Sequence, residues 1–230
     1  MIEVPAYAAE QVRAAEEPLL DAGEPLMARA AAALAGVASG MTDAARARIL
    51  ILAGSGNNGG DALFAAAHLA ETRSVDLLIV GTRVHEEGLA AAVAAGARRV
   101  ELPDVRDAAA GYDLVLDGIL GIGSTKDPAL RGTAREAVEA LLPAVRAGRT
   151  HVVAVDLPSG LHPNTGECDD AVLPASVTVT FGGVKTGLVR GRGPEMTGDI
   201  VLVDIGLREQ LDAVEPAGTA QVSRIVDAAG

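Results

Sequence analysis

The stretch "RILILAGSGNNGGDAL", residues 48–63, decides the fold. Its first part, up to Gly54, is a continuous aliphatic run of strand length, and a run that is apolar on both faces is typical of a buried parallel strand. The second part combines glycines with short polar side chains, and a helical pattern begins near Asp61. The sequence therefore predicts a strand, a permissive turn and a helix in direct succession.

The same alternation continues along the chain. The predicted strands cover residues 48–54, 75–81, 112–118 and 151–160, and the helices between them cover residues 61–72, 86–95 and 130–147. Two later strands, 176–183 and 198–206, are expected to extend the same sheet. A local change of strand direction there stays an open alternative. Strands that alternate with helices predict an α/β fold with a doubly wound sheet covered on both faces.

Two further helices are predicted near the N-terminus, over residues 8–23 and 24–40, because each segment has apolar residues at helical spacing and stops at a glycine. Pro18 is expected to break or kink the first of them. The sequence contains no internal repeat and no low-complexity linker. We therefore expect residues 1–230 to form a single domain.

The composition limits the possible partners. The net charge is −12, with 19 basic and 31 acidic residues, so the chain lacks the basic surface that a nucleic acid requires. No apolar run approaches the length of a membrane span, and the acidic N-terminus does not resemble a signal peptide. A single cysteine, Cys168, excludes an intrachain disulfide. We expect a soluble, cytoplasmic protein that binds neither nucleic acid nor membrane.

The glycine-rich turn points to a small ligand. Gly54 and Gly56 would permit a tight turn at positive φ, and Gly59 and Gly60 would let a ligand approach the main chain. The turn resembles a phosphate-binding loop but matches neither the P-loop nor the G-x-G-x-x-G pattern. Asn57 and Asn58 supply carbonyl oxygens for a ribose hydroxyl or a hard cation. The structural alternative, a turn in which Asp61 caps the helix, leaves both asparagines unexplained.

Two other strands end in comparable loops, and ligands of parallel α/β sheets bind at the carboxyl ends of the strands. "LDGILGIG" places Asp117 at a strand end before two more glycines, and "AVDLPSGL" places Asp156 after a run of valines. A partly desolvated aspartate is suited to acid–base chemistry, whereas an Asx turn is its structural alternative. Three such loops at one edge favour a site.

In their order and spacing, "GSGNNGGDAL", "DGILGIG", "AVDLPSGL" and "VTFGGVKTGL" resemble the NAD(P)H-hydrate epimerase family, whose domain is also called the YjeF N-terminal domain. "EPLMARAAAALA" and the closing "GDIVLVDIGL" extend the resemblance over almost the whole chain. The resemblance implies a three-layer α/β/α Rossmann-like sandwich, with a mostly parallel sheet and the two N-terminal helices. It also implies an isomerase that interconverts the R and S epimers of NADHX and NADPHX.

The resemblance also implies roles for individual residues, and Asp156 is the residue we expect to act as general acid and base. Asn58, Asp117 and Ser159 match the family's potassium ligands, which makes K⁺ the expected cofactor. Lys185 matches a lysine that could balance a phosphate or carboxylate charge, with an ordinary surface lysine as the alternative. The positions that match the substrate-binding residues are Asn57, Asn58, Gly59, Gly60, Asp61, Gly121, Ile122, Gly123, Ser124, Lys126, Asp156 and Lys185.

Two alternatives to a stand-alone epimerase stay open at this point. The first is a non-catalytic nucleotide-binding or scaffold module of the same fold. The second is the N-terminal half of a bifunctional enzyme, in which an ADP-dependent dehydratase follows as a fused or separate partner. The apolar N-terminal helices predict a homodimer, and the sequence does not reveal a preference between NADHX and NADPHX.

Overall fold

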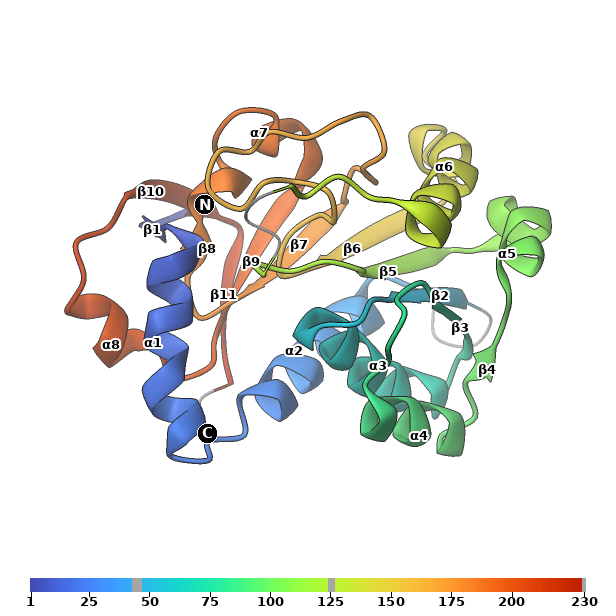
Figure 1. The fold of residues 1–230 in the computed structure, drawn as a ribbon, viewed down its shortest axis with the longest axis horizontal. Helices are drawn as coiled ribbons and strands as arrows, with labels where there is room; N and C mark the ends of the chain where they lie inside the picture. Colours follow the sequence, from blue (N-terminus) through green and yellow to red (C-terminus); the bar gives the residue numbers. More distant parts are fainter. Residues whose placement is uncertain (43–46, 124–126, 229–230) are drawn as a thin grey trace.

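A computed structural model describes residues 1–42, 47–123 and 127–228. Its main sheet has eight strands that pair in parallel throughout, in the order β11-β9-β7-β6-β5-β2-β3-β4 (Figure 1). These strands are β2 (Arg48–Ala53), β3 (Ser74–Ile79), β4 (Arg98–Arg99), β5 (Leu114–Gly118), β6 (His151–Val155), β7 (Val177–Phe181), β9 (Asp199–Asp204) and β11 (Arg224–Asp227). The predicted α/β class is confirmed.

Helices cover both faces of this sheet. In Figure 1, α2, α3 and α4 lie below the sheet, and α5 and α6 lie above it. The helices are α1 (Ala9–Asp21), α2 (Leu26–Gly40), α3 (Asn57–Ala70), α4 (Glu86–Ala94), α5 (Leu102–Ala108), α6 (Gly132–Arg146), α7 (Gly193–Met196) and α8 (Arg208–Asp212), with 3₁₀ turns at Ala109–Gly111 and Thr186–Leu188. Three layers result, as expected.

The aliphatic run of β2 explains why it occupies the middle of the sheet. Ile49 and Ile51 belong to the hydrophobic core between the sheet and helices α2 and α3. Leu50 and Leu52 belong to the core between the opposite face of the sheet and helices α5 and α6. Side chains of a strand alternate between faces, so a strand covered on both sides must be apolar at every position. The continuous pattern of residues 49–53 is the sequence expression of that burial.

The order of the strands places a topological switch between β2 and β5. From β2 the chain proceeds to β3 and β4 on one side, and from β5 it proceeds to β6 and β7 on the other. Ala53 pairs with Gly118 at the carboxyl ends of the two strands, so the loops that follow them leave the sheet side by side. Ligands of open α/β sheets bind at this kind of crevice.

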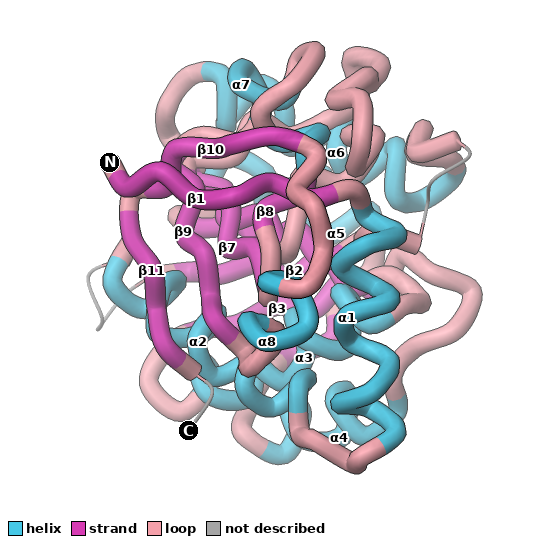
Figure 2. Tube along the Cα trace, turned by 90° about the vertical axis from the view of Figure 1, so that its left-hand side faces the viewer, coloured by secondary structure: helices cyan, strands magenta, loops and turns pink. Residues whose placement is uncertain are grey.

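A second, small sheet was not predicted. It has the order β10-β1-β8, with β1 (Ile2–Tyr7) antiparallel to β10 (Gly218–Val222) and parallel to β8 (Val184–Lys185). Figure 2 shows β10 and β1 side by side, with β9 and β11 running down from them. Tyr7 pairs with Lys185, so this sheet fixes where α1 begins and where Lys185 lies.

Several boundaries differ from the prediction. Pro18 does not break α1, which continues to Asp21. β7 and β9 keep the direction of the other strands, so no change of direction occurs there. The short strands β4, β8 and β11 were missed because two to four residues carry little periodic pattern, and the longer strands β1 and β10 were missed as well. Within the described residues, no helix combines the length and the apolar character that a membrane crossing needs.

Candidate functional site

The glycine-rich turn is tighter than the sequence suggested, and for a different reason. A Cβ at Gly54 would lie 1.8 Å from the carbonyl oxygen of Ile119, and one at Gly59 would lie 2.2 Å from that of Gly54. Neither Gly54 nor Gly56 has a positive φ, so that expectation was wrong. These glycines allow the β2 and β5 loops and the start of α3 to pack backbone against backbone.

The helix after the turn begins four residues earlier than predicted. Gly56 is the N-cap of α3, and Asn57 is its first helical residue. Asp61 therefore lies inside the helix, and the alternative in which it caps the helix is wrong. The first turn directs its free N–H groups toward the carboxyl edge of the sheet, where an anion would be stabilised.

Asn58 connects all three polar loops. Its Nδ2 donates hydrogen bonds to the carbonyl oxygens of Leu120, at 3.2 Å, and Val155, at 2.5 Å. Ser159 accepts a hydrogen bond from the Leu120 N–H at Oγ, at 2.9 Å, and donates its own N–H to Asp117 Oδ2 at 2.8 Å. The three predicted potassium ligands, Asn58, Asp117 and Ser159, thus lie in one buried hydrogen-bond network.

The donor atoms of this network fit a hard cation. Burial raises the pKa of the Asp117 carboxyl, and hydrogen bonds from Ser159 and Ile119 oppose the shift. Asn58 Oδ1 accepts no hydrogen bond within the described ranges, and a Cβ at Gly121 would lie 2.3 Å from it. Amide, carboxylate, hydroxyl and carbonyl oxygens are the ligands that such cations prefer. No group of three or more His, Cys, Asp or Glu that could hold a metal occurs among the residues described.

Asp156 occupies a special backbone position. Its φ is +69°, the only positive value among the described residues other than glycine, and aspartate tolerates this region better than most residues. Its Oδ1 accepts hydrogen bonds from Thr180 Oγ1 and the Phe181 N–H, both at 3.2 Å, and from Lys185 Nζ. Oδ2 accepts none from the described residues. One carboxylate oxygen is therefore held and the other is available.

Lys185 is not a surface residue. Its side chain is only 1% exposed, and Nζ also donates to the carbonyl oxygen of Phe181 at 2.9 Å and to Thr180 Oγ1 at 3.3 Å. The surface alternative is therefore wrong. Because its contacts are with Asp156 and its neighbours, Lys185 balances the charge of that carboxylate and holds it in place.

Two more carboxyl groups complete an acidic cluster around Asp156. Burial raises the pKa of Asp61 well above its ordinary value, the charges of Asp156 and Glu16 add to the shift, and Lys185 opposes it. Burial also raises the pKa of Glu16 on α1, where Lys185 again opposes and Asp156 adds. Perturbed carboxyl groups that gather in one cavity are typical of functional sites.

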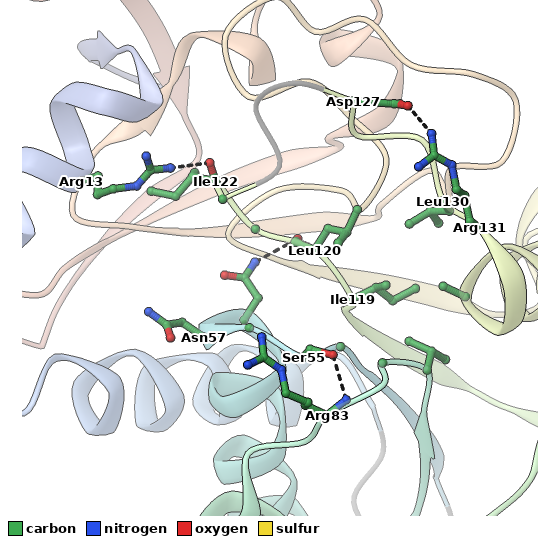
Figure 3. Close-up of a pocket in the computed structure, with 18 of the residues that line it drawn as sticks. Arg13, Ser55, Asn57, Arg83, Ile119, Leu120, Ile122, Asp127, Leu130 and Arg131 are labelled. Carbon is green, nitrogen blue, oxygen red and sulfur yellow. Dashed lines mark hydrogen bonds and ion pairs between the residues drawn. The ribbon is translucent and has the colours of Figure 1, made fainter.

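Two cavities meet at this edge of the sheet. The smaller, of about 110 Å³, is lined by Asp61, Asp156 and Glu16, with apolar side chains of α2 and Phe181 around them. The larger, of about 670 Å³, runs over the glycine-rich turn and the loops after β3 and β5 (Figure 3). They share five lining residues: Glu16, Leu20, Asn57, Asn58 and Ile122. The two cavities therefore form one cleft. The smaller is its narrow inner cavity, and the larger is its outer cavity.

The structure brings seven of the twelve predicted substrate-binding residues to this cleft. Gly59, Gly60 and Lys185 line neither cavity, since the two glycines face the protein interior and Lys185 lies behind Asp156. Ser124 and Lys126 lie outside the described residues. The residues that do line the cleft are Asn57, Asn58, Asp61, Gly121, Ile122, Gly123 and Asp156.

The cleft is also lined by residues that the sequence did not predict, namely Arg13, Glu16, Arg83 and Arg131. Figure 3 shows Arg13 reaching the Ile122 carbonyl oxygen, a hydrogen bond of 2.8 Å. Only Glu16 left a trace in the sequence. It stands four residues after the buried Val12 and therefore next to the apolar stripe of α1, where a charged side chain is unusual.

Comparisons with known proteins agree with this description. The family model of the YjeF-related protein N-terminus matches residues 23–187. The NAD(P)H-hydrate epimerase of Microbacterium testaceum is 56% identical over 95% of this chain and 85% of its own length. That of Clavibacter michiganensis subsp. michiganensis is 51% identical over 87% of this chain and 90% of its own.

Two further matches concern length and fold. A bifunctional NAD(P)H-hydrate repair enzyme, Nnr, of Mycobacterium tuberculosis is 40% identical over 87% of this chain, which covers 41% of that enzyme. The crystal structure of yeast ynu0 superimposes with a TM-score of 0.69 at 19% identity, covering 84% of this chain and 86% of the yeast chain. The second match supports the fold alone.

Proposed function

This chain belongs to the family of YjeF-related protein N-termini, and on that premise we propose that it is an NAD(P)H-hydrate epimerase. The similarity to enzymes of that name extends over nearly the whole chain and nearly the whole of those enzymes. The protein is thus an isomerase of nicotinamide nucleotide repair. Its substrates are NADHX and NADPHX, which it converts between the R and S forms.

The reaction changes the configuration of one carbon. The substrate carries a hydroxyl on C6 of its reduced nicotinamide ring, next to N1. When the hydroxyl receives a proton, the N1 lone pair expels it as water and leaves an electrophilic C6. Water then adds to the opposite face of C6 and gives up a proton. Protons and electrons balance, and the reaction consumes no oxidant.

Asp156 is the residue that carries the proposal. Three donors occupy Oδ1, whereas Oδ2 has no partner among the described residues and Asp156 lines the inner cavity. A proton can therefore be exchanged with substrate at Oδ2 without disturbing the bonds that hold the side chain. Lys185 holds this carboxylate through Oδ1, so that Oδ2 faces the incoming water.

Asp61 supplies the second group that inversion requires. The departing hydroxyl and the incoming water occupy opposite faces of the ring, and Asp61 and Asp156 reach the inner cavity from different elements, α3 and the loop after β6. The raised pKa of Asp61, caused first by burial, favours its protonated form. Asp61 protonates the hydroxyl while Asp156 receives a proton, and the roles exchange in the reverse direction.

The rest of the substrate occupies the outer cavity. A volume of about 670 Å³ is in the range that binds ligands of this size. Asn57 and the free N–H groups of the first turn of α3 lie where the pyrophosphate would pass. The narrow inner end then receives the nicotinamide ring, which places C6 beside the two aspartates.

Asn58, Asp117 and Ser159 would hold a potassium ion, with Leu120 and Val155 carbonyl oxygens nearby. Such an ion supplies a fixed positive charge close to the bound nucleotide. Asn58 and Asp117 would bind the ion with little movement, because Asn58 Nδ2 and the Asp117 carboxylate are already held by backbone groups of the same loops.

The alternative of a binding module is less well supported, because the perturbed carboxyl cluster has no role in a scaffold. A dehydratase, fused or separate, is the partner that the match to bifunctional Nnr favours. A homodimer through the N-terminal helices and a location in the cytoplasm stay predictions. The buried face of α1 and α2 contributes to the core of this chain, which leaves less apolar surface for a dimer.

The test follows the consumption of R-NADPHX in the presence of potassium and an S-specific dehydratase. Wild-type protein should accelerate consumption far beyond the spontaneous rate. Asp156→Asn should abolish most of that acceleration, since asparagine keeps the left-handed backbone but cannot exchange the proton. Asp107→Asn, on the exposed surface of α5, is the matched control. If wild-type protein binds the dinucleotide but leaves the spontaneous rate unchanged, the protein is a binding module.

A further inference from the structure

The loop between β3 and α4 forms one wall of the outer cavity. The Val80 N–H donates to the Ala53 carbonyl oxygen at 3.0 Å, and the Arg83 N–H donates to Ser55 Oγ at 3.3 Å. A Cβ at Gly81 would lie 2.2 Å from Ser55 Oγ. The loop is therefore fixed against the glycine-rich turn, and the position of the Arg83 backbone is determined by that turn.

The side chain of Arg83 differs from the other two arginines of the cavity. Arg13 donates to the Ile122 carbonyl oxygen, and Arg131 forms an ion pair with Asp127. The guanidinium of Arg83 has no hydrogen bond or ion pair with the residues that the structure describes. Figure 3 shows it extending beside Asn57 and Ser55. A cation without a partner lines a cavity of an otherwise acidic protein.

The position of Arg83, in the loop after β3, indicates which group of a ligand it would bind. In doubly wound folds an acidic residue after the second strand of the nucleotide-binding unit contacts the ribose 2′-hydroxyl of NAD, whereas an arginine there accommodates the 2′-phosphate of NADP. Here that strand is β3, which follows β2 and the glycine-rich turn. Residues 80–85 contain no acidic side chain and contain Arg83.

We propose that Arg83 forms a subsite for the 2′-phosphate of the substrate, and that it directs the enzyme toward NADPHX. This inference rests on the proposed function. It also agrees with the direction of the cleft, because Asp156 follows β6 and Asp61 lies in α3, whereas Arg83 follows β3. A dinucleotide whose ring lies at the inner end would cross the first turn of α3 and bring its adenosine ribose toward β3. An arginine is suited to a phosphate because its planar fork donates two parallel hydrogen bonds.

The experiment measures binding of two probes by calorimetry, ADP-ribose and its 2′-phosphorylated form, to wild-type protein and to Arg83→Gln. The variant should weaken binding of the 2′-phosphorylated probe by about 10- to 100-fold, the range of a lost charge-assisted contact. Binding of ADP-ribose should change by less than about 2-fold. Arg149→Gln, an exposed arginine just before β6 that lines neither cavity, is the matched control.

Equal weakening of both probes would overturn the proposal, since it would place Arg83 at the pyrophosphate. An unchanged affinity for both probes would also overturn it. Kinetics with the two hydrates give a second readout, in which Arg83→Gln should raise KM for NADPHX and leave KM for NADHX unchanged. If wild-type protein epimerises neither hydrate but shows the Arg83-dependent difference between probes, the proposed function fails and the phosphate subsite stands.

Discussion

Carboxyl groups are buried both near the amino ends of the strands of the main sheet (the amino edge) and near their carboxyl ends (the carboxyl edge). Their pKa values shift in opposite directions. Near the amino edge, Asp76 of β3 accepts hydrogen bonds from Arg98 at 3.0 Å, from Arg48 at 3.2 Å and from the Tyr112 hydroxyl at 3.0 Å. Burial raises the pKa of Asp76, but these partners outweigh it and the pKa is lowered. At the carboxyl edge, Asp61 is buried to a similar extent and its pKa is raised well above the ordinary value.

The difference lies in how completely each carboxyl is satisfied. Both oxygens of Asp76 have charged or hydroxyl donors, so its ionised form is stable and its charge serves the fold. Asp156 has one satisfied oxygen, and Asp61 has no hydrogen bond with the described residues. A protein tolerates such groups where substrate or ions complete them. The amino edge therefore stabilises, and the carboxyl edge is available for chemistry.

Removing the Asp156 carboxylate entirely should give the largest effect on stability. Asp156→Ala would leave the buried Lys185 ammonium without its counter-charge, and loss of one partner of a buried pair costs about 3–5 kcal/mol. Alanine is also less tolerant of the positive φ at this position. Urea unfolding should detect the loss, and Asp156→Asn should recover part of it. Equal stability of the alanine variant and the wild type would mean that Lys185 finds another partner.

Asp76→Asn should weaken the fold and leave catalysis unchanged. Loss of hydrogen bonds to a charged group should lower the free energy of unfolding by about 1–3 kcal/mol at neutral pH. Because the folded pKa of Asp76 is lowered, its contribution is present above the ordinary value of about 3.9 and disappears as the pH falls through the folded pKa. Unfolding curves at neutral and acid pH measure this difference, with Asp107→Asn as control. A reduced kcat in this variant would contradict the division between the edges.

Gly121→Ala should sharpen the comparison by disturbing the cation network of the carboxyl edge through Asn58. The new Cβ would come within 2.3 Å of Asn58 Oδ1. The Asn58 amide, which is held by the hydrogen bonds of its Nδ2, would therefore have to move. Overpacking of this kind costs about 1–3 kcal/mol, so activation by potassium should require a roughly 10-fold higher concentration. Gly36→Ala, where a Cβ meets nothing within 4 Å, is the control. An unchanged potassium response would remove Asn58 from the proposed ligands.

The sequence allowed prediction of the central layers because their patterns are long and one-dimensional. The strand of residues 48–54 and the helix of residues 130–147 are covered on defined faces, and the pattern of apolar residues records that coverage. The small sheet could not be predicted in the same way, since β8 has two residues and β1 pairs with a strand more than 200 residues away. Its importance lies in placing Lys185 and α1.

The candidate site was predictable where one local segment supplies both backbone and chemistry. Asn57, Asn58 and Asp156 stand in polar segments that closely follow apolar strands, and this pattern is visible in the sequence. Glu16 and Arg83 belong to the cleft only because tertiary packing brings α1 and the β3–α4 loop to it. Whether Lys185 lies at the surface or is buried likewise depends on distant elements, since its partner Asp156 is 29 residues earlier.

Asp61→Asn should have the smallest effect on stability, and with the opposite sign to Asp76→Asn. A folded pKa above the ordinary value of about 3.9 means that the ionised form is disfavoured in the native state. The penalty is fully present above the folded pKa and absent below the ordinary one. The variant should therefore be more stable than wild type at neutral and alkaline pH, by about 0.5–2 kcal/mol, and this gain should vanish in acid. Its epimerase activity should fall at the same time, because a neutral amide cannot donate the proton. A variant that gains stability and keeps full activity would mean that Asp61, like Asp76, has a structural role and no catalytic one.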